Sequence, residues 1–564
     1  MEFDDLRKHI NDDEPKEEII KAYEKLLKEN IKNVEELKEW ISSFDKLSNI
    51  IEERLRRNYA KFNGYNNDLK IKKTYEYDQQ YIMPIINEYK DKINNFIYNS
   101  SLKDELDSYY DLMLKIKRND IEIFRKENIP LSVEENKLAN KYYDVTGSMT
   151  VIWDGEEKTL PQMSKYLRNE NRDVREKAFK LIEERILQDK EKLDDIFDKL
   201  VHIRNEIAKN AGFSNYRDYM FKYLRRFDYN PEDCNEFHEA VRKYVVPLKE
   251  KIEKRKAKEL GVNSFRPWDE QGVFKGETPL KPCNSTRELI NGVTNIFYKL
   301  NPFFGDVLNR MDKEKTLDLD SRKFKSPGGF CDYFPESNIP FIFMNSDNSQ
   351  GDMVTLCHEG GHSVHAMLAS HIKVPEYKDT PSEIAELASM SMELLTMEHW
   401  KEFYNEEDFK RAKREQLEGI IKFLPWAMVV DKFQHWIYLN PDVTEEERNE
   451  EFTKIAKAFV YTYMDWSGLS EELKHRWKKQ LHIYEVPFYY IEYAIAQLGA
   501  LQVYKNYKEN KENAIKMYKN GLSEGAEKPL RELYKDTGIK FDFSEDMIKE
   551  LMDFLWNELE EVYK

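Results

Sequence analysis

The most informative stretch of this chain is Met353-Val354-Thr355-Leu356-Cys357-His358-Glu359-Gly360-Gly361-His362-Ser363-Val364-His365. His358 and His362 are four residues apart, so on a helix they lie one turn apart on the same face. Two imidazoles in that arrangement can bind one zinc ion, and Glu359 is then close enough to take a proton from a water on the metal. The alternative is a buried helix with two hydrogen-bonded histidines. Only 11 histidines occur in 564 residues, and four of them fall between positions 358 and 371, which favours the metal.

Composition narrows the class of protein. Apolar residues make up 40% of the chain and aromatic residues 13%, which excludes wholesale disorder. The net charge of −17 disfavours nucleic acid as a partner, because phosphate binding needs clustered positive charge. The four cysteines have no CxxC spacing, so they predict neither a disulfide framework nor a thiolate zinc site.

Two observations bear on location. The first eighteen residues are charged from the second residue onward and lack the apolar core of a signal peptide. No run approaches the eighteen or so apolar residues that a membrane span needs. We therefore expect a soluble, cytoplasmic protein without a membrane partner.

Helical periodicity dominates the chain and predicts a mainly α fold. Apolar stripes recur with the helical period, as in Ile19, Ile20, Tyr23, Leu26 and Leu27. Residues 149–153, followed by Asp154-Gly155, instead predict a β-hairpin. No linker rich in Gly, Ser or Pro interrupts the chain. We expect two helical lobes, an N-terminal region at 1–160 and a larger region at 161–564.

A second strand-like region precedes the histidine motif. Residues 326–331 (Ser-Pro-Gly-Gly-Phe-Cys) predict a loop, and residues 340–345 (Pro-Phe-Ile-Phe-Met-Asn) predict a strand led by a proline. Such a strand suits a sheet edge, which can bind an extended peptide, although an ordinary hairpin fits equally well. Residues 346–352 then offer several N-caps for the helix that carries the histidines.

A catalytic zinc site needs a third protein ligand. In the metzincin arrangement it would be a histidine at position 368, but that residue is Leu368. The other common solution is a glutamate on a following helix, and residues 380–389 start such a helix after a cap and a proline. Glu383, Glu386 and Glu393 are the candidates, and their apolar neighbours indicate a buried helix.

These motifs together resemble a known family. Residues 358–365 are similar to the HExGHxxH signature of the M3 metallopeptidases, the thimet oligopeptidase and oligoendopeptidase F family. Residues 385–389, with Glu393, resemble that family's third-ligand segment. The likeness extends over about residues 120–505, and the length and tyrosine-rich tail look more like the bacterial Pz-peptidase-type members. Further matching segments are Trp153-Asp154-Gly155, Arg172-Asp173-Val174-Arg175, Ala211-Gly212-Phe213 and Phe330-Cys331.

The resemblance implies a catalytic constellation and a fold. It implies one zinc ion held by His358, His362 and Glu386, with Glu359 as general base. It also implies a two-lobed helical metallopeptidase in which a deep channel, with a small β-sheet beside the zinc helix, admits short peptides and excludes folded proteins. The expected activity is hydrolysis of internal bonds in short peptides.

A tyrosine-rich segment, residues 482–494, completes the expected site. A tetrahedral oxyanion forms during peptide hydrolysis, and phenol or imidazole donors stabilise it. By resemblance His482, Tyr490 and Tyr493 have this role, and Tyr489 is a rival because the match slips by about one residue.

Two residue interpretations and two alternative functions complete the predictions. We interpret His365 as packed beside the site rather than as a ligand, and Cys357 as a core residue. One alternative function is an M32-like zinc carboxypeptidase, which also combines HExxH with a later glutamate. Another is a non-catalytic helical peptide-binding protein, which an intact Glu359 disfavours because binding zinc structurally needs no general base.

Overall fold

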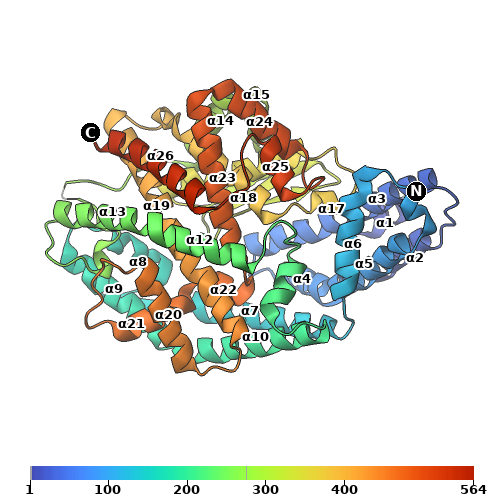
Figure 1. Ribbon diagram of the computed structural model, residues 1–564, viewed down its shortest axis with the longest axis horizontal. Helices are drawn as coiled ribbons and strands as arrows, with labels where there is room; N and C mark the ends of the chain where they lie inside the picture. Colours follow the sequence, from blue (N-terminus) through green and yellow to red (C-terminus); the bar gives the residue numbers. More distant parts are fainter. Residues whose placement is uncertain (1–2, 275) are drawn as a thin grey trace.

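The computed structural model describes residues 3–274 and 276–564, and the fold is mainly α-helical, as predicted (Figure 1). The first helices gather at one end of the molecule. Residues from 3 to 113 form most of a hydrophobic cluster of their own, to which Ile372, Val374 and Tyr377 also contribute. These helices are α1 (Asp4–His9), α2 (Lys16–Leu27), α3 (Val34–Gly64), α4 (Leu69–Tyr77), α5 (Met83–Tyr98) and α6 (Asp111–Ile123).

The middle of the chain begins with a helix and the predicted hairpin. Strands β1 (Thr150–Trp153) and β2 (Glu156–Thr159) pair antiparallel, and Asp154 and Gly155 form the turn with positive φ angles. This confirms the hairpin. The surrounding helices are α7 (Asn128–Gly147), α8 (Leu160–Leu167), α9 (Arg172–Leu187), α10 (Lys190–Asn210), α11 (Tyr216–Tyr223), α12 (Pro231–Tyr244) and α13 (Val246–Glu259).

Most of the remaining helices share one large hydrophobic core with this middle part, except that Tyr377 belongs to the first cluster and Leu473 to a small third cluster. They are α14 (Thr286–Leu300), α15 (Pro302–Lys313), α16 (Gln350–Leu368), α17 (Pro375–Lys378), α18 (Ser382–Met397), α19 (Glu406–Leu439), α20 (Glu445–Phe459), α21 (Ser470–Lys474), α22 (Leu481–Glu485), α23 (Tyr490–Glu509), α24 (Lys511–Ser523), α25 (Leu530–Asp536) and α26 (Glu545–Tyr563). The boundary near residue 160 stays a prediction. No helix within the described residues is both long and apolar enough to cross a membrane.

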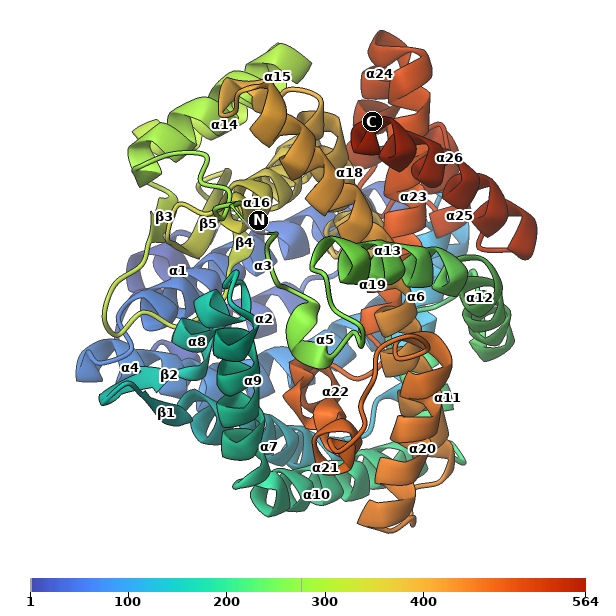
Figure 2. The same ribbon diagram turned by 90° about the vertical axis from the view of Figure 1, so that its left-hand side faces the viewer.

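A three-stranded sheet lies beside α16 (Figure 2). Its central strand β5 (Ile339–Ser346) pairs in parallel with β3 (Leu317–Asp320) and antiparallel with β4 (Phe330–Phe334). Strand β4 therefore forms one edge, and the predicted strand at 340–345 is confirmed. Pro340 removes one backbone donor at a position opposite Tyr333, near the end of the β4 ladder.

Two glycines set how closely the helices around the histidine motif approach each other. A Cβ at Gly361 would lie 2.7 Å from the backbone oxygen of Ala388 in α18, and a Cβ at Gly499 in α23 would lie 2.7 Å from a methyl carbon of Leu387. Only glycine permits these contacts without a shift. They bring α16, α18 and α23 together, so the chemistry-bearing faces of three helices converge.

Candidate metal centre and active site

The helix of the histidine motif has a well-defined start. The Ser349 hydroxyl accepts a hydrogen bond from the Asp352 backbone N–H, and the Asp352 carboxylate accepts one from the Ser349 backbone N–H, which is a capping box. The expected cap in residues 346–352 is thus confirmed. With this start, His358 and His362 lie on the α16 face toward α18, and their side chains remain about one-fifth exposed.

Glu386 of α18 lies opposite the two histidines. One of its carboxylate oxygens, Oε2, is 3.3 Å from Nε2 of His358 and 3.6 Å from Nε2 of His362. A tetrahedral ion with ligand bonds of about 2.0–2.1 Å separates its ligand atoms by about 3.3 Å. The three side chains therefore fit one metal ion, and one ligand atom from each lies within 4.8 Å of the other two.

Glu393 orients the first histidine. Its Oε1 lies 2.7 Å from Nδ1 of His358, and its Oε2 accepts a hydrogen bond of 2.8 Å from the Gln416 amide. Because the carboxylate accepts from Nδ1–H, that proton stays on Nδ1, and Nε2 is the nitrogen that would bind a metal ion lying between His358 and Glu386. Glu393 thus supports His358 from behind and is outside the three-residue group.

The electrostatics of Glu386 suit a permanently charged ligand. Burial alone would raise the pKa of this carboxyl, but His362 and His358 outweigh it and lower the pKa to about 2. The Tyr489 hydroxyl donates to its Oε1 at 2.9 Å, and the Ser389 hydroxyl lies 3.0 Å from its Oε2. The carboxylate is therefore ionised and held in place at neutral pH.

Glu359 lies next to this group but takes no part in it. Its side chain is nearly buried, and burial raises its pKa to about 7 although His358 lowers it. The backbone N–H of Cys331, in the edge strand β4, donates a hydrogen bond to its carboxylate. A carboxyl group with a pKa near neutrality is suited to accept and release protons at neutral pH.

The third candidate glutamate, Glu383, has a different environment. It is 3% exposed, and it accepts a 2.6 Å hydrogen bond from the Tyr229 hydroxyl rather than facing the histidines. Burial raises its pKa, while Arg226 lowers it. Glu383 is part of a buried polar cluster behind α18 that also contains Glu492, whose Oε1 accepts a 2.8 Å hydrogen bond from Arg226.

His365 and Cys357 also lie inside the protein. Burial lowers the pKa of His365 to about 3, and no hydrogen-bond partner of its Nε2 is found within the described residues. Burial raises the pKa of the Cys357 thiol to about 12. Neither residue belongs to the group of three ligand candidates.

His482, in α22, is held by a two-step hydrogen-bond chain. The Trp426 indole N–H donates to Gln480 Oε1 at 2.8 Å, and the Gln480 amide then donates to His482 Nδ1 at 2.7 Å. Because burial lowers the pKa of His482 to about 4, the ring is neutral at pH 7 and carries its proton on Nε2. Sequence reasoning missed Gln480, since a lone glutamine two residues before a histidine has no recognisable pattern.

The tail tyrosines surround the His482 ring. The ring centroids of Tyr490, Tyr493 and Tyr489 lie 4.9, 5.8 and 6.3 Å from it. Tyr489 contacts Glu386 directly, as described above, and burial raises the pKa of Tyr493 with further contributions from Glu386 and Glu359. Tyr489 and Tyr493 therefore lie near Glu386, whereas Tyr490 contacts His482 and Tyr493, and the separate roles of the three tyrosines stay predictions.

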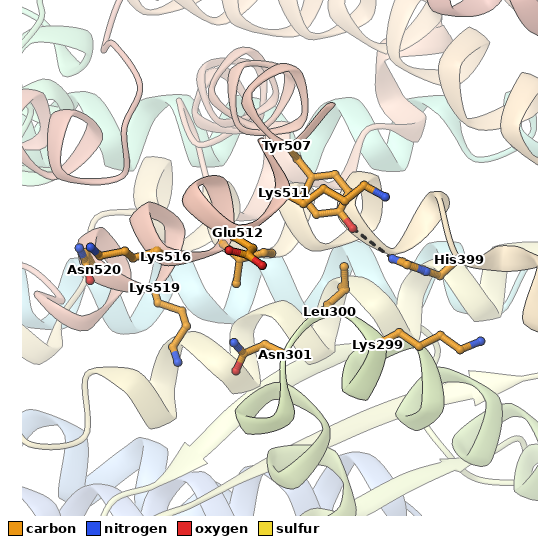
Figure 3. A pocket seen from close by; sticks show the side chains of 11 residues that line it. Lys299, Leu300, Asn301, His399, Tyr507, Lys511, Glu512, Lys516, Lys519 and Asn520 are labelled. Carbon is orange, nitrogen blue, oxygen red and sulfur yellow. Dashed lines mark hydrogen bonds between the residues drawn. The ribbon is translucent and has the colours of Figure 1, made fainter. Parts of the chain in front are cut away.

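Two surface cavities differ in how they lie relative to this site. An open cavity of about 630 Å³ between α14, α23 and α24 is lined by Lys299, Lys511, Lys516 and Lys519 together with the His399–Tyr507 hydrogen bond (Figure 3). It contains none of the predicted site residues. A second cavity of about 460 Å³ is lined by Ser382 and Glu383, at the start of the helix that carries Glu386.

In this helical fold, two histidines of one helix meet a glutamate of another, and a second, buried glutamate lies beside the first histidine. These features define the class of HExxH metallopeptidases. Comparison with known proteins makes the class specific. The chain belongs to peptidase family M3, whose model matches residues 165–553.

Individual relatives agree with that assignment. The chain is 24% identical to an oligoendopeptidase F homolog of Borreliella burgdorferi, over 81% of this chain and 78% of the relative. It is 22% identical to oligopeptidase PepF of Bacillus subtilis, over 81% and 69% of the two chains. The solved structure of Pz peptidase A with an inhibitor superposes with a TM-score of 0.91 at 28% identity, over 97% of both chains. The expected family, metallopeptidase class and helical fold are thus confirmed.

Proposed function

We propose that this protein is a zinc-dependent endo-oligopeptidase that hydrolyses internal bonds of short peptides. The observation that carries the proposal is the convergence of His358, His362 and Glu386 at the spacing of a tetrahedral metal site. Two nitrogen ligands and one carboxylate oxygen form the donor set of many catalytic zinc sites. Zinc bound there would polarise the attacking water and the scissile carbonyl group.

The protein's own groups supply the proton transfers. Glu359, buried beside the two histidines, takes a proton from the attacking water and passes it to the leaving amine. Its near-neutral pKa suits both steps. The Cys331 backbone N–H holds the carboxylate in position, which links the base to the edge of the sheet.

Donors across the site stabilise the oxyanion. His482 presents a neutral Nε2–H because Gln480 occupies its other nitrogen, and a neutral donor avoids placing a second cation beside the metal. The phenol groups of Tyr490 and Tyr493 supply further donors. The Tyr489 hydroxyl already donates to Glu386, so we assign it to holding that ligand.

Two features support short, extended peptides as substrates. Strand β4 is an edge strand whose Cys331 lies against Glu359, and an edge strand can pair with an extended peptide through main-chain hydrogen bonds. The cavity lined by Ser382 approaches the site from the other side, since the Ser382 side chain hydrogen-bonds Tyr489. A channel that admits peptides and excludes folded proteins is the geometry we propose.

The test uses a decapeptide blocked at both termini. Mass spectrometry should find two fragments that each keep one blocked end, cleavage should stop with a chelator, and added zinc should restore it. Denatured casein, as the control for size selection, should survive. Cleavage only of peptides with a free C-terminus would support a carboxypeptidase instead, and rapid digestion of casein would refute the size limit.

A further inference from the structure

Helices α12 and α19 bring a second set of metal-ligating side chains together, away from His358 and His362. Helix α12 contributes Cys234 and His238, and α19 contributes Asp431 and His435. Within each pair the residues are four apart, so both lie on one helix face. Relative exposures of 1%, 0%, 0% and 5% show that the cluster is buried.

This cluster contains more polar atoms than its hydrogen bonds satisfy. The Asp431 Oδ2 atom lies 2.8 Å from His238 Nε2, and it also lies 3.2 Å from His435 Nε2 without hydrogen-bond geometry. Among the described residues, Asp431 Oδ1, His238 Nδ1 and both ring nitrogens of His435 lack a hydrogen-bond partner. A buried polar group without a partner destabilises the folded state unless something else satisfies it.

A different cluster of candidate ligands is neutralised by a lysine. Asp194, Glu445 and His475 form another group with ligand atoms close together, but there the Lys478 ammonium contacts all three side chains. That group is an ion-pair cluster around a protein cation. In the described part of the chain, the ion-pair partners of Asp431 are only the two histidines.

We propose that Cys234, Asp431 and His435 bind a second metal ion of the zinc class. Their ligand atoms all lie within 4.8 Å of one another, and the 3.2 Å between Asp431 Oδ2 and His435 Nε2 matches the edge of a tetrahedral site. Thiolate and imidazole select zinc-like ions over magnesium or calcium. His238 donates to the Asp431 carboxylate and orients it, as supports of metal ligands do.

Charge and position support this site. A divalent ion, a thiolate and a carboxylate sum to zero, which removes the penalty of a lone buried charge. The site would also tie α12 to α19 next to the catalytic tail. Gln434, adjacent to His435, accepts a hydrogen bond from the Phe488 backbone N–H, and the rings of Phe488 and His435 pack 5.4 Å apart. Phe488 directly precedes Tyr489, so the second metal would order the segment that holds Glu386.

The test is substitution with cobalt(II), because a cobalt–thiolate bond gives a charge-transfer band that a site of histidines and glutamate lacks. The full-length protein should bind two equivalents of cobalt and show this band. Cys234→Ser should lose the band and one equivalent. Glu386→Gln should lose the other equivalent and keep the band, which separates this site from the proposed catalytic one.

The control is Cys331→Ser, since Cys331 is the thiol beside Glu359 and a rival source of the band. It should keep both the band and the two equivalents. One equivalent and no band in the wild-type protein would overturn the proposal, and so would a band that Cys234→Ser leaves intact. Because the wild-type and Glu386→Gln measurements do not need a folded Cys234 variant, the proposal remains refutable if that variant fails to fold.

Discussion

The assignment of the third ligand gives the sharpest prediction, because two glutamates three residues apart on α18 have opposite environments. Glu386→Gln replaces the carboxylate whose Oε2 lies 3.3 and 3.6 Å from the two histidine nitrogens. Loss of an orienting partner of a metal ligand costs about 10–100-fold in metal affinity, so loss of the ligand itself should cost more than about 100-fold. The amide oxygen can still accept from Tyr489, so we expect the fold to persist.

Glu383→Gln is the matched control, and its effect should be on stability alone. An uncharged amide replaces the acceptor of the 2.6 Å bond from Tyr229, which costs about 1 kcal/mol. The change also removes a carboxyl group close to Glu492, whose raised pKa reflects burial and then Glu383, and that offsets part of the cost. A glutamate in the first turn of an exposed helix would give only a few tenths of a kcal/mol. Because Glu383 is buried, we expect Glu383→Gln to lower the stability by more than that.

The assay for this pair is metal content by mass spectrometry after dialysis against a weak chelator, with urea unfolding in parallel. We expect the Glu386 variant to lose the metal of the catalytic centre and activity while unfolding near the wild-type midpoint. The Glu383 variant should keep that metal. Metal retained in the Glu386 variant and lost in the Glu383 variant would refute the ligand assignment.

Three further predictions concern the tyrosine-rich tail and the buried polar cluster that contains Glu383 and Glu492. Tyr490→Phe and Tyr493→Phe should each lower kcat by roughly 10–1,000-fold with unchanged metal content, and equal losses of stability and rate would make them core residues instead. Gln480→Leu should lower kcat more than it changes KM, because the His482 imidazole loses the hydrogen bond that fixes its tautomer. Gln480→Glu keeps the size of the side chain but accepts a hydrogen bond instead of donating one, so it should not restore the rate. Burial and a neighbouring carboxylate raise the pKa of Glu492. The folded state therefore keeps a proton that the unfolded state releases above about pH 4.5. As a result, the free energy of unfolding falls as the pH rises from there through the raised pKa. Glu492→Gln should therefore make urea stability depend less on pH between 5 and 8, and an unchanged slope would contradict this.

Local patterns predicted much of the fold and the centre of the site. The four-residue spacing of His358 and His362 already implies one helix face, and the turn residues Asp154 and Gly155 identify their hairpin because both need positive φ angles. The proline-led strand at 340–345 could be found from its β-branched and aromatic composition. Each of these signals depends only on neighbours in the sequence.

Features made by distant parts of the chain could not be predicted in that way. Glu383 has the position of an ordinary first-turn acid, and only Tyr229 and Arg226, about 150 residues earlier, make it a buried residue. Gln480 acquires its role from Trp426 on another helix. Whether Tyr489, Tyr490 or Tyr493 faces the metal depends on how α23 packs, which periodicity alone does not determine. A cytoplasmic location and the division near residue 160 also stay predictions.

The central claim is that Glu359 activates water at a zinc site to cut internal peptide bonds, and one comparison tests it directly. Wild-type protein and Glu359→Gln are each loaded with zinc, checked for equal metal content, and incubated with a decapeptide blocked at both ends, with fragments quantified by mass spectrometry. We predict internal cleavage by the wild type and a rate about 100–10,000-fold lower in the variant. A fully loaded variant that retains more than about a tenth of the wild-type rate would contradict the mechanism.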